Sequence, residues 1–304
     1  MKKTIYLLLA LPFLMVSCNN DEQAINEETL QVSFTAGIST HIGSRSETEE
    51  RSVNKVVCAV FDAKTEKEVL RETKDITDEQ IVFEPRLIKG RSYHVAFWAM
   101  KGDNYDVTNM REIKRASTNN SIDEENEDNY DAFTGTITIN NILHTTTQQI
   151  TLTRPLAQLN IGITEEDWNA VSNPETFNQT PGTVEIPNLG FSSFDAMQGK
   201  ACGEEVNRTL TATGNELIVN GQTFKTLAKC YFFPTGANQD INITVKDNST
   251  DKKEIRIVEV KNVPFNVNYK TNLVGSFLTG TITFNVSLGD TAFGEDENQN
   301  QEIE

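Results

Sequence analysis

The chain has 304 residues and a formal net charge of −17 at pH 7, a length that accommodates two domains of ordinary size, each with its own core. Nucleic acid is excluded as a partner class, because binding to phosphates requires clustered Lys and Arg side chains. The same acidity disfavours electrostatic docking to anionic lipids but leaves a covalent lipid anchor open.

Residues 1–17 have the features of a secretory signal peptide. Lys2 and Lys3 precede an apolar run that is too short to span a bilayer. The segment leads into Leu-Met-Val-Ser-Cys, which resembles a bacterial lipobox, so Cys18 is predicted to become the lipidated first residue of the mature protein. Attached acyl chains would then anchor the protein to a membrane. The alternative is an ordinary signal peptide followed by a chance cysteine.

Residues 18–29 are polar and acidic, and we expect them to form a flexible tether between the lipid and the folded part. Asp21 and Glu22 resemble export signals that send some lipoproteins to the outer face of the outer membrane. Apolar and polar side chains then alternate over 31–38, which predicts the first strand.

The alternation is lost in residues 40–52, which are rich in charged and small side chains. They predict an exposed loop that contains Arg45 and Arg51. Residues 56–61 are apolar on both faces, as in a central strand that is covered on both sides. Further strands are predicted at 80–83, 92–99 and 134–139. Short strands separated by turn residues favour an all-β sandwich or barrel.

An acidic, asparagine-rich stretch occupies residues 118–131. Its carboxylates suit Ca²⁺, but it lacks the glycine of an EF-hand loop. We therefore expect a solvated loop and no metal site.

The stretch TLTRPLAQLNIGI, residues 151–163, marks a boundary. Before it the apolar side chains occupy even positions, and after it they occupy odd ones. Because strand side chains alternate between faces, the chain is predicted to change core across Arg154 and Pro155. Proline suits such a bend, since it cannot donate to a ladder. The predicted domains are 30–154 and 155–289.

The second half is also predicted to be mostly strands. Residues 164–168 indicate the capped start of one short helix. Strands are predicted at 183–186, 217–219, 230–233, 241–245, 255–260, 263–269 and 281–288. Residues 290–304 form an acidic tail that we expect to be disordered.

No catalytic, metal or cofactor site is predicted. The histidines, His41, His94 and His144, lack any ligand spacing, and no GxSxG pentapeptide occurs. With Cys18 lipidated, three thiols remain and cannot all pair within one chain. Cys202 and Cys230 are the feasible disulfide, whereas Cys58 has the surroundings of a buried small hydrophobe. The other possibility is that all three are free.

Several stretches together resemble the fimbrillin-like lipoproteins, the subunits of type V pili in Gram-negative gut and oral anaerobes. They are the lipobox and residues 32–36, 93–99, 131–133, 154–159 and 268–275. The resemblance implies two tandem transthyretin-like (Greek-key) β-sandwich domains with little helix. It also implies a location at the cell outer membrane, within a fimbrium.

The resemblance further implies how such a subunit assembles. An Arg-specific protease cuts the loop after the first strand, here after Arg45 or Arg51. Loss of 31–38 would open a groove that another pilus subunit fills by donor-strand insertion. Both arginines could instead be solvated loop charges. Few apolar residues follow Leu288, so we expect a tip, accessory or anchor subunit and not a stalk subunit.

Two other hypotheses remain. The first is a surface lipoprotein that is never cut and that binds a glycan or a host protein through loops. Trp98 and Trp168 are the candidates for an aromatic platform, although tryptophans at such positions usually pack inside. The second is an enzyme without a recognisable motif.

Overall fold

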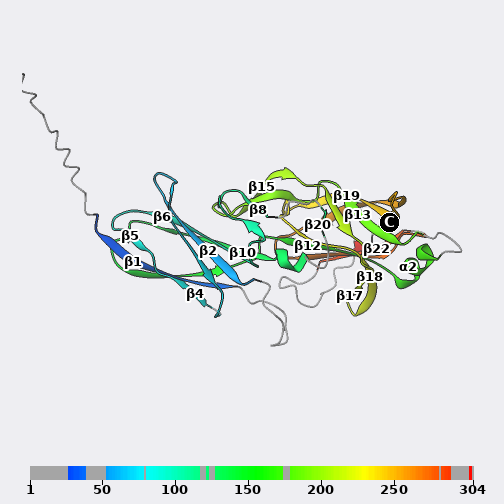
Figure 1. Cartoon of the computed structure of the whole chain (residues 1–304), viewed down its shortest axis with the longest axis horizontal. Coiled ribbons are helices and arrows are strands. Elements are labelled where there is room, and N and C mark those ends of the chain that lie inside the picture. Colours follow the sequence, from blue (N-terminus) through cyan, green and yellow to red (C-terminus); the bar gives the residue numbers. More distant parts are fainter. Residues whose placement is uncertain are drawn as a thin grey trace, which may run out of the picture.

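A computed structural model describes residues 27–38, 53–78, 80–116, 121–122, 127–173, 179–280, 282–288 and 301–302. The described part is built from strands joined by turns, together with the helix α2 (Glu165–Ser172) and the 3-10 helix η1 (Asp128–Tyr130). Figure 1 shows an elongated molecule with the strands of the first half on the left and those of the second on the right. The predicted all-β class is confirmed.

The first half contains two sheets that face each other. One sheet holds β11 (Thr146–Leu152), β1 (Thr29–Ile38), β4 (Gln80–Phe83) and β5 (Arg86–Ile88). The other has the order β10 (Ala132–Ile139), β6 (Tyr93–Met100), β2 (Lys55–Asp62) and β3 (Glu68–Asp75). β1 is an inner strand, because it pairs in parallel with β11 and antiparallel with β4 and β5.

The alternation of apolar and polar side chains along β1 explains how the core between these sheets is filled. Val32, Phe34 and Ala36 of β1 are fully buried, and they meet the apolar face of β6 that carries Val95 and Phe97. The opposite face of β6 is buried as well, as is almost all of β2, so the prediction of a central strand covered on both sides is confirmed for 56–61.

The second half also contains two sheets. One has the order β17 (Glu216–Val219), β18 (Gln222–Phe232), β12 (Ala157–Ile163), β21 (Lys270–Ser276), β22 (Thr283–Leu288) and β23 (Gln301–Glu302). The other has the order β20 (Glu254–Pro264), β19 (Asn238–Asp247), β13 (Pro181–Ile186), β16 (Arg208–Thr211) and β9 (Ser121–Ile122), and β9 is contributed by the first half of the chain. Their apolar faces enclose a second core.

Two local features position the ends of this second sandwich. Thr164 caps α2 by accepting a hydrogen bond from the Asp167 amide at 3.2 Å, which confirms the predicted helix start. Gly275 lets β21 and β22 approach closely, since a Cβ there would lie 1.8 Å from the carbonyl oxygen of Thr283. Any other residue at this position would force the two strands apart.

A small third layer joins the halves. β7 (Tyr105–Asp106) and β8 (Ile113–Arg115) come from the first half, and β14 (Phe191–Asp195) and β15 (Lys200–Glu205) from the second. β8 pairs with β14, so one sheet is shared between them. A third core lies beside it and contains Trp98, Phe194 and Phe233. The halves are therefore connected by packed strands as well as by the covalent joint.

The predicted change of core occurs at the joint. Leu152 packs in the first core, Leu156 in the shared core, and Ala157 in the second core. The phase flip across Arg154 and Pro155 thus sends successive apolar side chains into different cores.

The structure differs from the sequence predictions at several strands and in the tail, where residues 301–302 form β23 beside β22, so the expectation of disorder is wrong at these two residues. β3 was not predicted, because its side chains are mostly charged and none of its residues is fully buried. The strands predicted at 255–260 and 263–269 are instead one strand, β20, which ends at Pro264. Ile282, which lies in the strand predicted at 281–288, is 42% exposed and precedes β22. Among the described residues no helix is long and apolar enough to span a membrane.

Candidate functional site

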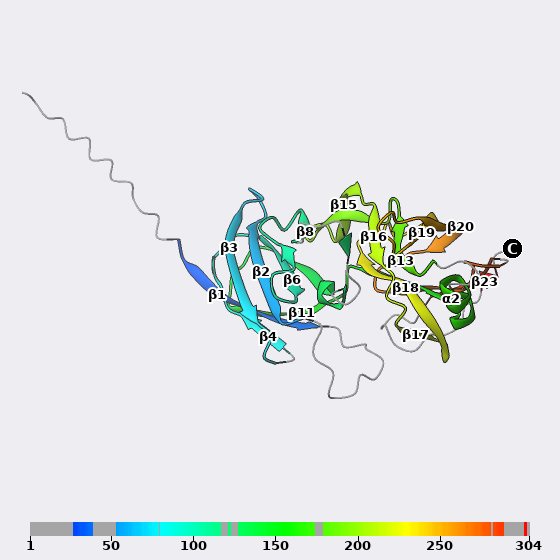
Figure 2. The ribbon, with the colours of Figure 1, turned by 45° about the vertical axis from the view of Figure 1, so that its right-hand side comes forward.

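The first candidate site is β1 together with the groove that it fills. The ring of Phe34 packs edge-on against Phe97, with centroids 5.9 Å apart, and Phe83 lies 5.8 Å from the same ring. Val32 and Ala36 occupy the neighbouring pockets on the same face of β1. Figure 2 shows β1 lying beside β11 along the lower side of the sheet.

Ladder hydrogen bonds hold β1 on both of its edges. Its register runs from Val32 opposite Thr146 to Ile38 opposite Leu152, and Phe34 faces Phe83 on the other side. Removing the strand would leave the facing edges of β11 and β4 unpaired. It would also open three adjacent apolar pockets.

Charged side chains fasten the start of β1. Arg86 donates to the hydroxyl and the carbonyl oxygen of Thr29, Lys89 contacts Glu28 at 2.9 Å, and Arg91 contacts Glu27 at 2.6 Å. The predicted lipidation site Cys18 and the predicted cleavage sites Arg45 and Arg51 lie outside the described residues. The ion pairs and hydrogen bonds described here therefore bear on how the start of β1 is held, and not on lipidation or cleavage.

The strand β22 is part of the protein's own core. Phe284 and Val286 are almost fully buried there, and Phe284 stacks on Phe277 with centroids 4.5 Å apart. Asp167 fixes the turn before β22, because its carboxylate accepts hydrogen bonds from the amides of residues 277–279 at 2.7–2.9 Å. β22 is therefore an integral strand of the protein's own second sandwich.

A buried ion pair sits at the joint between the halves. Arg154 donates from Nε to Asp131 Oδ1 at 2.5 Å and from Nη2 to Oδ2 at 2.7 Å, and both side chains are at least nine-tenths buried. Its Nη1 donates to Asn268 Oδ1 at 3.0 Å, and the guanidinium lies over the Phe133 ring at 4.7 Å. Burial opposes the charge, but hydrogen bonding and attraction to Asp131 outweigh it and raise the pKa of Arg154.

This contact brings together three of the stretches that carried the family resemblance. Residues 131–133 supply the carboxylate and the ring, residues 154–159 the arginine, and residues 268–275 the amide. Further along, the Asn160 side chain donates to Asn272 Oδ1 at 2.8 Å. The sequence showed each stretch separately, whereas their convergence appears only in the fold.

The acidic stretch 118–131 is more closely attached than a solvated loop would be. Where it is described, Ser121 and Ile122 form β9 beside β16, and Glu127 is fully buried. Glu127 accepts hydrogen bonds from Arg115 at 2.9 and 3.2 Å and from the Tyr231 amide at 2.7 Å. The expectation of a solvated loop was thus wrong at Glu127, which ties the stretch to β18.

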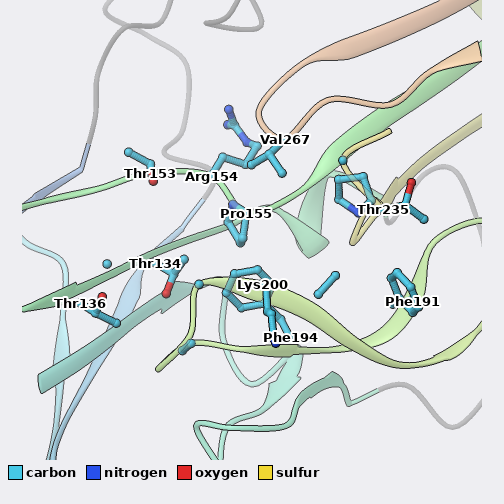
Figure 3. Close-up of a pocket in the computed structure, with 16 residues that line it drawn as sticks. Thr134, Thr136, Thr153, Arg154, Pro155, Phe191, Phe194, Lys200, Thr235 and Val267 are labelled. Atoms are coloured by element: carbon cyan, nitrogen blue, oxygen red, sulfur yellow. The ribbon is translucent and has the colours of Figure 1, made fainter. Parts of the chain in front are cut away.

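The second candidate site is a cavity of about 500 Å³ at the joint. Figure 3 shows Thr134 and Thr136 on one side of it, Pro155 above, and Phe191 and Thr235 on the other side. The lining combines β10, the joint, the β14–β15 hairpin and the loop after β18. Arg154 also lines the cavity, and its guanidinium is bound to Asp131.

The cysteines do not form the disulfide that the sequence allowed. Cys202 and Cys230 are both free, as is Cys58. Cys230 points from β18 into the second core, whereas the Cys202 sulfur on β15 approaches the hydroxyl of Ser193 and the carbonyl oxygen of Arg111. Cys58 is fully buried, as expected for a small apolar side chain.

We expect only Cys202 of these three thiols to react in the native protein. Burial raises the pKa of Cys58 and of Cys230 to about 12, and nearby Glu72 and Glu127 add to the effect. At about pH 8 both thiols therefore stay protonated, and the thiolate is the reactive form. Iodoacetamide labelling followed by peptide mass spectrometry should modify Cys202 first, and all three after unfolding in urea. Equal native labelling of Cys230 would contradict this.

The remaining candidates from the sequence do not assemble a site. Trp98 is fully buried against Tyr105 and Phe194, and Trp168 packs over Gly214, so the two do not form an exposed platform. Within the described ranges no group of three or more His, Cys, Asp or Glu side chains is placed to hold a metal ion.

Comparison with solved structures identifies proteins of the same fold. A candidate adhesin from Bacteroides thetaiotaomicron VPI-5482 has a TM-score of 0.54 at 12% identity, with 87% of this chain and 98% of that chain covered. A candidate polysaccharide-binding protein of the same organism has a TM-score of 0.53 at 11% identity, with coverage of 89% and 99%. A candidate adhesin from Bacteroides ovatus has a TM-score of 0.52 at 11% identity, with coverage of 91% and 98%.

At these identities the likeness establishes a shared fold, and the resemblance drawn from the sequence is confirmed as far as the fold is concerned. No curated protein matches the chain. A family model matches residues 22–304, so the chain belongs to the family of unknown function designated DUF6562.

Proposed function

We propose that the chain is a non-catalytic, lipid-anchored subunit of a type V pilus, located at the cell surface and serving adhesion. Cys18 carries the lipid, and Arg-specific cleavage after Arg45 or Arg51 releases β1. A strand from another subunit then takes the place of β1. The observation that carries this proposal is the central position of β1, whose apolar face fills three pockets between two pairing strands.

The physical basis is the exchange of one strand for another of the same pattern. Ladder hydrogen bonds to β11 and β4 supply sequence-independent strength, and the pockets of Val32, Phe34 and Ala36 select a strand with apolar residues at alternate positions. The shared fold with candidate adhesins supports a role at the surface.

We place the chain at the tip, in an accessory position or at the anchor. A stalk subunit must both accept a strand and donate one. β22 packs Phe284 and Val286 into its own core and pairs with β21 along its length, so its release would cost the second sandwich two buried apolar side chains.

Replacement of both Arg45 and Arg51 by lysine should block the release of β1. The substitution keeps the charge of the loop but removes the side chain that an Arg-specific protease recognises. Protein recovered from its native cells should then start at lipidated Cys18, whereas the unaltered protein should start at Ser46 or Ser52. The N-terminal sequence and the intact mass measure this.

Arg256→Lys in β20 is the matched control, because it makes the same chemical change away from the loop. Mature protein that starts at Cys18 without any substitution would contradict cleavage. It would favour instead an uncut surface lipoprotein.

That uncut lipoprotein, which binds a glycan or a host protein, is the second candidate function. The observation that favours it is the cavity at the joint, since ligand sites in proteins commonly lie where two packed units meet. One protein of the same fold is described as a candidate polysaccharide-binding protein. The two candidates are separated by the N-terminal sequence described above.

A further inference from the structure

The cavity at the joint has a preformed apolar wall. Phe194 is almost fully buried and packs against Trp98 and Phe233, with ring centroids 5.7 and 5.5 Å apart. Phe191 is only half-buried and shares the lining with Pro155. Because Phe194 is held by other rings, this wall does not need to rearrange to receive a ligand.

Threonine side chains line other parts of the same cavity. They are Thr134, Thr136, Thr153 and Thr235. Thr134 is 8% exposed, and its hydroxyl donates to the Phe97 carbonyl oxygen at 2.8 Å, which leaves its lone pairs as acceptors. Several hydroxyls beside an aromatic wall are suited to a ligand that itself carries hydroxyl groups.

The charge of the lining is opposite to that of the protein as a whole. The chain carries a net charge of −17, yet the cavity is lined by Arg154 and Lys200 and by no Asp or Glu. Arg154 is occupied by Asp131, so Lys200 is the cation available to a ligand. Lys200 makes no ion pair with any described residue. Asp195, opposite it in the hairpin, instead accepts hydrogen bonds from the Met197 and Gln198 amides.

We propose that this cavity binds an acidic sugar unit of monosaccharide size, such as a hexuronate. Its carboxylate contacts Lys200, its apolar ring face packs on Phe191, and its hydroxyls bond to Thr134 and Thr136. The volume of about 500 Å³ is in the usual range for small-ligand sites. This inference rests on the second candidate function, recognition at the cell surface, and it is independent of strand exchange.

Calorimetric titration of the mature protein with glucuronate and galacturonate tests the proposal, with glucose and galactose as neutral controls. The acidic sugars should bind and the neutral ones should bind at least about tenfold more weakly, since a charge-assisted hydrogen bond is lost. Salt at about 0.5 M should weaken binding, because the Lys200 contact is partly exposed. Tryptophan fluorescence provides a second readout of binding, because Trp98 touches Phe194.

Two variants locate the site. Lys200→Gln should weaken hexuronate binding by about tenfold or more and remove the preference over glucose. Phe191→Ala should weaken both sugars by several-fold through the loss of ring packing. Lys67→Gln is the matched control, because Lys67 is an exposed lysine that does not line the cavity. Near-ultraviolet circular dichroism checks that each variant keeps the native packing.

The possible results distinguish a wrong binding site from a wrong function. Hexuronate binding that is unchanged in Lys200→Gln would overturn the site while leaving recognition of a glycan in place. Equal affinity for glucuronate and glucose would overturn the assigned ligand class. No binding of any sugar, on the unaltered protein or in a glycan array, would overturn both this inference and the glycan form of the second candidate function.

Discussion

Arg154→Met should lower the free energy of unfolding by about 3–5 kcal/mol, because it leaves the buried Asp131 carboxylate without its cation. Methionine retains the apolar stem that lies over Phe133, so the loss is mainly electrostatic. Urea unfolding followed by tryptophan fluorescence measures the change, since Trp98 lies in the core shared by the two halves. The expected effect is large for a single substitution.

The double substitution Arg154→Met with Asp131→Leu should recover much of that loss. Replacing both members of a buried pair by apolar groups is often close to neutral, whereas removing one leaves an unpaired charge. Lys261→Met is the matched control. It breaks an exposed pair with Asp240 in which both side chains are more than half exposed, and it should lower the free energy of unfolding far less than Arg154→Met does. If Arg154→Met lowered the free energy of unfolding no more than Lys261→Met does, the charge of Arg154 would contribute little, and its role would be packing alone.

Much of the fold could be predicted from the sequence, because alternation directly reports which face of a strand is buried. The strand predicted at 80–83 coincides with β4, and those at 92–99 and 134–139 differ from β6 and β10 by at most a few residues. The phase flip located the change of core at Arg154 for the same reason. β3 escaped prediction, since an exposed strand carries no apolar period.

The candidate sites could be predicted only in part. The first strand was identified from Val32, Phe34 and Ala36, whereas its place between β11 and β4 depends on pairing with residues far along the chain. The ion pair joins positions 23 residues apart, and Asn268 lies 114 residues from Arg154. The cavity is lined by five separate segments of the chain, so no local sequence pattern predicts it. Cys18, Arg45 and Arg51 remain predictions.

Removal of residues 18–52 should prevent the first half from keeping its native packing unless a strand is supplied. Loss of a buried phenylalanine side chain such as Phe34 alone costs about 3–5 kcal/mol. β1 adds Val32, Ala36 and two ladders, so the total approaches or exceeds the about 5–15 kcal/mol that stabilises a whole domain. The shortened protein should bind the dye ANS and lose the near-ultraviolet signal of Trp98.

A peptide of residues 29–38 should reverse both changes, because it restores the ladders and fills the pockets together. Two altered peptides test whether alternate side chains select the strand. Phe34→Glu places a charge in the central pocket and should abolish rescue, whereas Thr35→Glu, one position along and on the opposite face, should retain it. Rescue by both peptides alike would mean that backbone pairing alone recruits the strand. A shortened protein that stays native without any peptide would show that β1 is dispensable, and strand exchange would then have no groove to fill.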